Sequence, residues 1–250
     1  MTERDLRVAP VETRPVAGVD GCRDGWLVVA ERPGREPEAF LAPDAGALVA
    51  ALPDDALLVV DVPIGLPEEG ARRCDVEARA FLGRPRAASV FPAPVRGVLD
   101  ATDYADALRR HRALDGRGLS LQAFHLLPRI RDVDRLMRAR PALRPRVREG
   151  HPEVAFALWA GAPIRAPKRS ADGRARRAAR VDAAWPDARE RARRDLRGAG
   201  RYAPDDLLDA FALLWSARRW AAGRVRTFPP RSHGASVDRD AHGLAMEIAA

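Results

Sequence analysis

Two apolar runs flank a glycine-bounded turn in the sequence VAGVDGCRDGWLVVA, residues 16–30. The first run, 16–20, ends in Asp20, and the second run covers Trp26–Ala30. Apolar runs that are joined by a short turn containing glycine are typical of a β-hairpin. We therefore expect the sheet of this protein to begin with an antiparallel pair of strands.

Outward from this hairpin, the chain alternates between further strands and helices. Leu57-Leu58-Val59-Val60 is a continuous apolar run, which is the pattern of a strand buried on both faces. The proline-containing segment 62–67 cannot continue a central strand. Shorter strands are predicted at 38–42, 145–149 and 225–228, and helices at 44–52, 72–82, 103–114, 119–138, from 151 onward, and at 204–222. This order predicts a mixed sheet with an antiparallel N-terminal half and crossover connections thereafter.

The length of 250 residues suits one domain with elaborations. We expect a flexible N-terminal arm at 1–15, a folded domain at 16–228 and a C-terminal tail at 229–250. No run approaches the roughly 20 apolar residues that span a bilayer, and the N-terminus lacks the apolar core of a secretory signal. Cys22 and Cys74 form neither a CxxC pair nor a disulfide framework. We therefore expect a soluble, cytoplasmic protein without a membrane partner.

The basic character of the chain is concentrated in one segment. The net charge is +8, from 43 basic and 35 acidic residues, and Lys168 is the only lysine. An arginine bias together with abundant Ala, Gly and Pro indicates a GC-rich coding background. Between Arg165 and Arg201 there are 13 basic and 5 acidic residues, an excess of 8 that equals the excess of the whole chain. Residues 170–199 predict two helices or a mobile lid.

Acidic residues stand at the ends of two expected strands. Asp20 ends the first core strand, and Asp61 ends the buried strand. Groups just beyond the carboxyl ends of strands line the functional crevice of an open α/β sheet. Two neighbouring carboxylates repel each other unless a cation or a proton lies between them. The alternatives are an ordinary Asp-Gly turn for Asp20 and a strand-ending residue before a Val-Pro turn for Asp61.

A third acidic position stands within an apolar helix. Asp209 belongs to the segment LLDAFALLW, residues 207–215, which is apolar nearly all round and should be buried. A buried carboxylate is costly unless it is paired or bound to a metal, and a pair with an arginine is the alternative to a functional role. Asp206 and Asp205 can share a helix face with Asp209, although acids in a first turn also complement the helix dipole.

Together these acids form an all-oxygen ligand set. Hard oxygen ligands suit Mg²⁺ or Mn²⁺ rather than Zn²⁺. Two such ions about 4 Å apart could activate a water and stabilise the leaving oxygen of a phosphodiester. We therefore expect a site that is dependent on Mg²⁺ or Mn²⁺. Its catalytic and metal-binding residues are expected to be Asp20, Asp61, Asp206 and Asp209.

The segment His151-Pro152-Glu153 adds candidates for proton transfer and metal binding. Glu153 could be a further ligand, and His151 could act as a proton shuttle. The alternative is a helix start, with proline in the first turn and glutamate facing the dipole. Glu149 lies nearby and could replace Glu153 as a ligand.

The basic candidates for substrate binding lie in two segments. Lys168 and Arg169 stand in a loop suited to grip a phosphate, and a lysine in an arginine-rich chain marks a place that needs a compact ammonium group. Chance is the alternative for Lys168. Arg72 and Arg79 share one helix face with Asp75, which fits substrate contact and equally fits a surface ion-pair ladder.

These residues belong to pieces that match a known family over most of residues 16–228. The pieces are Gly18-Val19-Asp20-Gly21-Cys22, Gly25-Trp26, Asp61-Val62-Pro63-Ile64-Gly65-Leu66-Pro67, Arg72 to Arg79, Leu82-Gly83, Ser89-Val90-Phe91, His151-Pro152-Glu153 with Phe156, Lys168 with Gly173, and Asp205-Asp206-Leu207-Leu208-Asp209-Ala210. The sequence resembles a bacterial and archaeal family of unknown function that is catalogued as predicted RNase H-like nucleases. The combination of pieces is specific, although each piece alone is not.

The resemblance implies an RNase H-like α/β fold, with a mixed five-stranded sheet flanked by helices and a helical elaboration in the second half. It implies that Asp20, Asp61 and Asp209 stand where the metal-binding acids of that superfamily lie. The pair of Asp206 and Asp209 looks like that of Holliday-junction resolvases. The implied activity is metal-dependent cleavage of phosphodiester bonds, with nucleic acid or a nucleotide as partner. Residues 84–145 form a longer middle segment than a minimal RNase H core needs.

Two other functions remain open. Actin-like phosphotransferases share the fold, but they usually have two related domains with two phosphate loops, and this chain has one Asp-Gly loop. A non-catalytic protein could instead hold nucleic acid through the arginines of 165–201. The sequence does not distinguish RNA, DNA, a junction or a small nucleotide as substrate, and it leaves the oligomeric state open, with a homodimer as one expectation.

Overall fold

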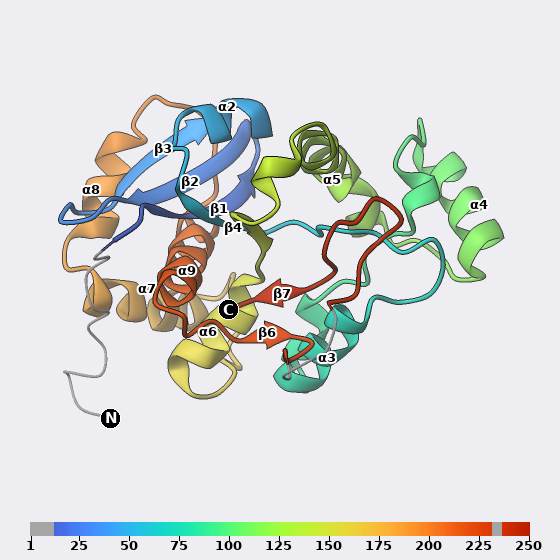
Figure 1. Ribbon diagram of the computed structural model, residues 1–250. Helices are drawn as coiled ribbons and strands as arrows, with labels where there is room; N and C mark the ends of the chain where they lie inside the picture. Colours follow the sequence, from blue (N-terminus) through green and yellow to red (C-terminus); the bar gives the residue numbers. More distant parts are fainter. Residues whose placement is uncertain (1–12, 232–236) are drawn as a thin grey trace.

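One seven-stranded mixed sheet forms the centre of the protein in the computed structural model, which describes residues 13–231 and 237–250 (Figure 1). The strands are β1 (Val16–Cys22), β2 (Gly25–Glu31), β3 (Glu38–Ala42), β4 (Leu57–Val60), β5 (Val147–Glu149), β6 (Thr227–Phe228) and β7 (Ile248–Ala249). Their order in the sheet is β3-β2-β1-β4-β5-β7-β6. The antiparallel pairs are β3–β2, β2–β1 and β7–β6, whereas β1, β4, β5 and β7 run parallel.

The N-terminal hairpin and the buried strand that the sequence predicted are confirmed. β1 and β2 pair from Val16 opposite Glu31 to Cys22 opposite Gly25, and every residue of β4 is buried. The sheet has two strands more than the expected five. Of the strands at the far edge, β6 lies within the strand predicted at 225–228, whereas β7 was not predicted, because a strand of two residues leaves no periodic signal in a sequence.

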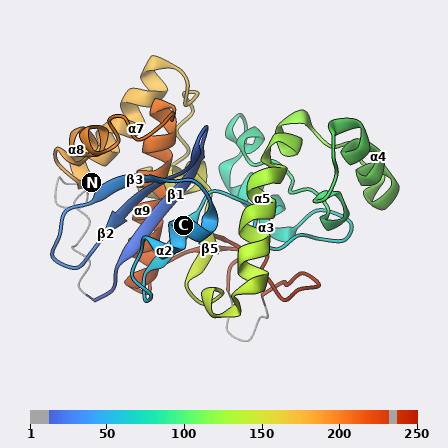
Figure 2. The same cartoon turned by 90° about the horizontal axis from the view of Figure 1, so that it is seen from above.

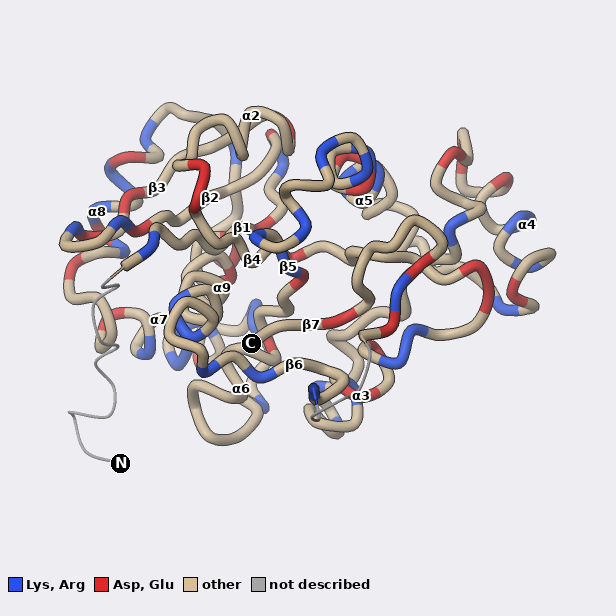
Figure 3. The backbone as a smooth tube through the Cα atoms, in the orientation of Figure 1, with Lys and Arg blue, Asp and Glu red and all other residues tan. Residues whose placement is uncertain are grey.

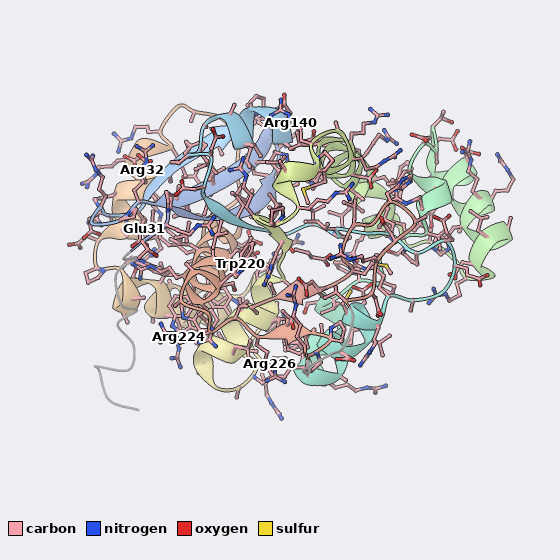
Figure 4. The ribbon with its side chains drawn as sticks, in the orientation of Figure 1. Glu31, Arg32, Arg140, Trp220, Arg224 and Arg226 are labelled. Atoms are coloured by element: carbon pink, nitrogen blue, oxygen red, sulfur yellow. The ribbon has the colours of Figure 1, made fainter. Side chains whose placement is uncertain are left out.

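The segment 229–250, which we expected to be a C-terminal tail that is loose apart from Gly243–Ile248, contributes β7 to the sheet. Ala250 donates its backbone N–H to the carbonyl of Arg226 at 2.8 Å, and Arg226, labelled in Figure 4, donates to the carbonyl of Ala250 at 2.7 Å. Further back, the Asp240 carboxylate accepts the backbone N–H of Leu66 at 3.2 Å. The segment therefore extends the sheet and also supports the loop after β4. Residues 1–12 of the expected arm lie outside the described residues.

Helices cover both faces of the sheet (Figure 2). They are α2 (Ala45–Ala50), α3 (Arg73–Leu82), α4 (Tyr104–Asp115), α5 (Leu121–Ala139), α6 (Pro152–Ala160), α7 (Ala171–Ala184), α8 (Ala188–Asp195) and α9 (Pro204–Ala221), with short 3-10 turns at Arg86–Ser89, Arg96–Val98 and Pro141–Leu143. One core packs beneath α2 and α5, and the other packs beneath α3 and α6 to α9. The arginine-rich stretch forms two helices, α7 and α8. None of the helices within the described ranges has the length and apolarity needed to cross a bilayer.

Side-chain alternation along the central strands determines which residues face α9. Val16 and Cys22 of β1 belong to the same core as α9, whereas Val19 belongs to the core beneath α2 and α5. Since side chains alternate between faces with a period of two, Asp20 lies on the α9 side. Val59 of β4 also faces the α9 core, so the same alternation puts Asp61 on that side.

Helix α9 packs directly against the backbone of β1. At Gly18, an added Cβ atom would lie 2.0 Å from the backbone nitrogen of Leu214 and 2.1 Å from the carbonyl oxygen of Ala210. Only glycine permits this approach, which explains why a glycine interrupts the apolar run of β1. Farther along α9, the buried guanidinium of Arg218 donates to the buried carboxylate of Glu31, which Figure 4 labels. The helix therefore holds a close and fixed position over the sheet.

Candidate active site

Three acidic side chains meet on the α9 side of the sheet, at the carboxyl ends of β1 and β4. The backbone N–H of Asp61 donates to the carbonyl of Val19 at 2.9 Å, which continues the parallel ladder and sets Asp61 beside Asp20. Asp209 lies on α9, which packs on β1, and it is 1 % exposed. Asp20 is 6 % exposed. The three acids that the sequence analysis drew from separate segments therefore lie together.

Lys168 joins this cluster from the loop before α7. Its Nζ donates to Oδ2 of Asp209 at 2.7 Å and lies 3.5 Å from Oδ2 of Asp205. The other oxygen of Asp209, Oδ1, is buried and has no hydrogen-bond partner among the described residues. The loop is held by Gly173, where an added Cβ would lie 1.9 Å from the carbonyl oxygen of Pro167. The ammonium group of Lys168 is therefore held in a defined position within the site.

Burial and mutual repulsion together set the protonation of the carboxylates. Burial, and then the negative charges of Asp61, Asp209 and Asp206, raise the pKa of Asp20 well above its usual range. Burial also raises the pKa of Asp209 to about 7, even though Lys168 opposes this shift. For Lys168, burial alone would lower the pKa, but the carboxylates, led by Asp209, raise it above its ordinary value. The ammonium therefore stays charged, and the site retains excess negative charge.

Asp206 lies one helical turn before Asp209 and has a second task. Its Oδ2 accepts the backbone N–H of Ala203 at 2.7 Å at the beginning of α9. Burial raises the pKa of Asp206, and its charge contributes to the raised pKa of Asp20. Asp206 therefore caps the N-terminus of α9 and adds to the negative charge of the site. A role of Asp206 as a metal ligand stays a prediction.

We expect the carboxylate cluster to destabilise the folded protein at alkaline pH. In the window between roughly 4, the pKa of an unfolded aspartate, and about 7, the pKa of Asp209, the folded state holds more protons than the unfolded state. Stability must therefore fall as the pH rises through this window. An Asp20→Asn variant should raise the free energy of unfolding at pH 8 by on the order of 1–3 kcal/mol, and by less at pH 5.

Urea denaturation of both proteins at pH 5 and pH 8 in EDTA measures this difference. Asp100→Asn is the matched control, because the Asp100 side chain is 81 % exposed and should leave stability nearly unchanged at either pH. If the free energy of unfolding of Asp20→Asn at pH 8 is lower than that of the wild-type protein, the expected repulsion between the carboxylates is contradicted.

The donor set fits a hard divalent cation by its chemistry. Asp20, Asp61 and Asp209 offer carboxylate oxygens, which Mg²⁺ and Mn²⁺ prefer. In addition, the buried Oδ1 of Asp209 is an acceptor without a donor among the described residues. Across residues 13–231 and 237–250, no three His, Cys, Asp or Glu side chains are already arranged to hold a metal ion. The ammonium group of Lys168 lies against Asp209 and also interacts electrostatically with Asp20 and Asp61.

A pocket of about 250 Å³ opens beside the cluster. Its lining comes from the loop after β4, the segment after α3, helix α5 and the start of α6. The residues are Asp61, Val62, Pro63, Arg72, Asp75, Arg86, Ser89, Val90, Phe91, Leu126, Glu149, Gly150, His151, Pro152, Glu153, Lys168, Asp209 and Ile248. The predicted residues His151, Glu153 and Lys168 therefore share one cavity with two of the three central acids.

His151 has a defined tautomer in this pocket. Its Nε2 lies 3.1 Å from the carbonyl oxygen of Ser89. Because a carbonyl oxygen only accepts hydrogen bonds, Nε2 carries the proton of the neutral ring. Its Nδ1 is buried and has no hydrogen-bond partner among the described residues. The neutral ring therefore presents a free lone pair at Nδ1.

Glu153 is held by two arginines that the sequence analysis did not identify. Arg177, 1 % exposed, donates to both carboxylate oxygens of Glu153, at 2.7 and 2.8 Å. Arg86 lies 2.9 Å from Oε2 of the same residue. With both oxygens engaged, Glu153 acts on the site through its charge, which contributes to the raised pKa of Asp209. An arginine-rich chain gives no signal that singles out these two.

Arg72 belongs to a buried network, in place of the substrate contact or surface ladder that we expected. It is 2 % exposed and donates to both oxygens of Glu149, at 2.7 Å each, and to Oδ1 of Asp75 at 2.6 Å. Its remaining donors contact Oδ2 of Asp75 and the carbonyls of Ile64 and Gly65 at 3.2 Å. No N–H of Arg72 is left for a phosphate. The network instead ties α3 and β5 to the loop that follows Asp61.

The other two predicted substrate contacts lie outside the pocket lining. Arg79 donates to the carbonyl of Val90 at 2.6 Å and so supports the segment that bears Phe91. Arg169 is exposed, and its carbonyl oxygen accepts a hydrogen bond from Arg174 at 2.6 Å. A role in substrate binding stays a prediction for both residues.

Seven of the 13 basic side chains of the segment 165–201 contact a carboxylate of the protein. Figure 3 shows acidic positions among the basic ones along α7 and α8. The basic side chains of the segment that contact a carboxylate are Lys168, Arg176, Arg177, Arg189, Arg191, Arg193 and Arg201. These contacts offset part of the basic charge of the segment, and binding of nucleic acid through its arginines stays a prediction.

Sequence reasoning also missed the apolar side of the pocket. Phe91 was present in the matched piece Ser89-Val90-Phe91, but no role was attached to it. It is 37 % exposed and lines the pocket together with Leu126 of α5. Arg129, one helical turn further along α5, donates to the carbonyl of Cys22 at the end of β1. An aromatic residue in a loop between proline-containing segments was the available signal for Phe91.

Comparison with known proteins gives one match. A family model described as "Protein of unknown function (DUF429)" matches residues 18–233. No curated protein and no solved structure matches the chain. The family model spans the hairpin, the strand that precedes Asp61, the His151 segment, Lys168 and α9, which are the parts that build the site. The chain therefore belongs to the DUF429 family of proteins of unknown function.

Proposed function

We propose that this protein is a Mg²⁺- or Mn²⁺-dependent nuclease that hydrolyses phosphodiester bonds. The observation that carries the proposal is the meeting of Asp20, Asp61 and Asp209 on one face of the sheet, at the carboxyl ends of two parallel neighbours. Burial, and then the charge of Asp61, raises the pKa of Asp20, and the same two causes contribute to the raised pKa of Asp209, so the arrangement is costly for the folded protein. Such costly clusters are typical of functional sites.

The sheet order supports an RNase H-like core. Within β3-β2-β1-β4-β5, the first three strands are antiparallel neighbours and β4 and β5 run parallel to β1. This arrangement agrees with the mixed sheet and antiparallel N-terminal half that the sequence predicted, and a late helix, α9, packs over the first strand. The strands β6 and β7 and the helices between residues 84 and 145 are then elaborations. Fold analogy alone does not establish an activity, so the proposal depends on the acids.

The residues of this chain that would hold the metal are Asp20, Asp61 and Asp209, with Asp206 adding charge behind them. When bound, Mg²⁺ or Mn²⁺ would acidify water and offset the negative charge that develops on a phosphate. Lys168 positions one oxygen of Asp209 and leaves the other free. Its ammonium also attracts the phosphate of a substrate toward the carboxylates.

Proton transfer is assigned to His151. With Nε2 donating to Ser89, the lone pair on Nδ1 is available to accept a proton from the attacking water. Glu153 does not compete for this task, because Arg86 and Arg177 occupy its oxygens.

The test is cleavage of fluorescently labelled oligonucleotides by the full-length protein. Single-stranded and duplex RNA and DNA are each incubated with EDTA, Mg²⁺ or Mn²⁺. We expect cleavage of at least one substrate with a divalent ion and none with EDTA. The Asp61→Asn protein, purified in parallel, controls for contaminating nucleases. Absence of cleavage with either ion, while a nucleotide raises the unfolding temperature, would favour a phosphotransferase instead.

A further inference from the structure

The pocket beside the carboxylates has a second kind of wall that phosphodiester chemistry does not require. Ten of its lining residues are charged or polar, among them Asp61, Asp209 and Lys168. The apolar lining residues include Pro63, Val90, Phe91, Leu126, Pro152 and Ile248. The apolar wall therefore adjoins the reacting centre directly, within a cavity of about 250 Å³.

Phe91 is the large aromatic member of this wall. It remains 37 % exposed although it lines a cavity, which makes it one of few large apolar side chains with a substantial exposed area among the described residues. The two residues that precede Phe91 accept hydrogen bonds from side chains of other elements. Arg79 donates to the carbonyl of Val90 at 2.6 Å, and His151 donates to the carbonyl of Ser89 at 3.1 Å. The ring is therefore presented on a supported backbone.

A duplex would leave this wall without a partner. Proteins contact duplex backbones mainly through charged and polar groups on phosphates and sugars, and the bases of a duplex are stacked inside it. An unpaired base, in contrast, stacks on aromatic side chains. The cavity is smaller than the roughly 300–1,000 Å³ typical of ligand sites, so it suits a single ring system.

We propose that this pocket receives one unpaired nucleobase that stacks on Phe91. The substrate class is then single-stranded nucleic acid or a free nucleotide, and not a duplex. This inference rests on the proposed function, since it takes the adjoining carboxylates as the place where the phosphodiester reacts. Lys168, which lines the same cavity, is placed to meet the phosphate that is attached to the base.

Binding is the direct test, and it is separate from cleavage. All comparisons use full-length Asp61→Asn protein in EDTA, so that cleavage is stopped and one repelling carboxylate is removed. Fluorescence anisotropy gives the Kd for a labelled single strand, for the same strand in a duplex, and for a strand of equal length that lacks its bases. We expect the base-free strand to bind roughly 5- to 150-fold more weakly than the single strand, as expected from the energy of one base–aromatic stack.

Substitutions at Phe91 assign the effect to this pocket. Phe91→Ala should weaken single-strand binding by a similar factor, roughly 5- to 150-fold, and should leave binding of the base-free strand unchanged. Phe91→Tyr should restore binding, because it keeps the aromatic ring. Leu121→Ala is the matched control, since Leu121 on α5 is 53 % exposed and does not line the pocket. Competition by a mononucleotide at concentrations equal to those of the oligonucleotide would identify free nucleotides as the ligand, and weaker competition would identify the strand.

The outcomes separate this inference from the nuclease proposal. Equal affinity for single strand, duplex and base-free strand, or no effect of Phe91→Ala, overturns the base pocket even if the wild-type protein cleaves. Base-dependent binding that is lost in Phe91→Ala supports the pocket even if no divalent ion produces cleavage.

Discussion

Asp61→Asn is expected to reduce metal-dependent cleavage by roughly 10³-fold or more, because one ligand of a divalent ion supplies several kcal/mol of transition-state stabilisation. The side chains of aspartate and asparagine have nearly the same shape, so the loop after β4 should keep its position. Asp61 follows a fully buried strand and donates its backbone N–H to Val19, and the substitution leaves this bond intact. The defect should therefore be in the chemistry and not in folding.

Initial rates at saturating Mn²⁺, together with thermal unfolding of each protein, measure this loss. Asp100→Asn, at an exposed position, should retain wild-type activity. Mn²⁺ should raise the unfolding temperature of the wild-type protein and raise that of Asp61→Asn much less. A folded Asp61→Asn protein that cleaves at the wild-type rate would remove Asp61, and with it the proposed metal centre, from the mechanism.

Gly18→Ala is expected to prevent stable folding. The new methyl group would lie 2.0 Å from the nitrogen of Leu214 and 2.1 Å from the oxygen of Ala210. Both are backbone atoms of α9, so no side-chain rotation can relieve the clash. The helix would have to move away from β1, and with it the apolar residues of its inner face. We expect a loss of more than about 4 kcal/mol, which is at the extreme of single substitutions.

Soluble yield and urea denaturation of the variant provide the measurement. Gly118→Ala is the matched control, because a Cβ at Gly118 would meet only Leu108 Cδ1 at 3.9 Å. This control should differ from wild type by no more than about 0.5 kcal/mol. A Gly18→Ala protein with wild-type stability would show that α9 does not need its close approach to β1.

The acid cluster could be predicted because its determinants are local. The pattern around Asp20 and Asp61 marks strand ends, and the apolar surroundings of Asp209 mark burial. Parallel pairing then brings two strand ends to one edge of the sheet. The approach of α9 to β1 also has a local sign, the glycine at position 18.

The partners of the charged residues could not be predicted, because they depend on tertiary contacts. Arg72 and Arg177 look in the sequence like the many other arginines, yet both are almost fully buried on glutamates. Their roles follow from the positions of Glu149 and Glu153, which lie 77 and 24 residues away along the chain. The strand β7 was missed for a similar reason, since two residues become a strand only when β5 and β6 are beside them.

The tethered ammonium of Lys168 sets the ionic stoichiometry of the proposed reaction. Asp20, Asp61, Asp206 and Asp209 carry four negative charges when ionised, and Lys168 returns one positive charge, which leaves three. A single divalent ion offsets two of these charges, whereas a potassium ion offsets only one. A second divalent ion would enter a site with one negative charge left and would meet repulsion from the first. An anionic substrate supplies the further negative charge that favours its entry, so that occupancy by two ions becomes a property of the loaded protein.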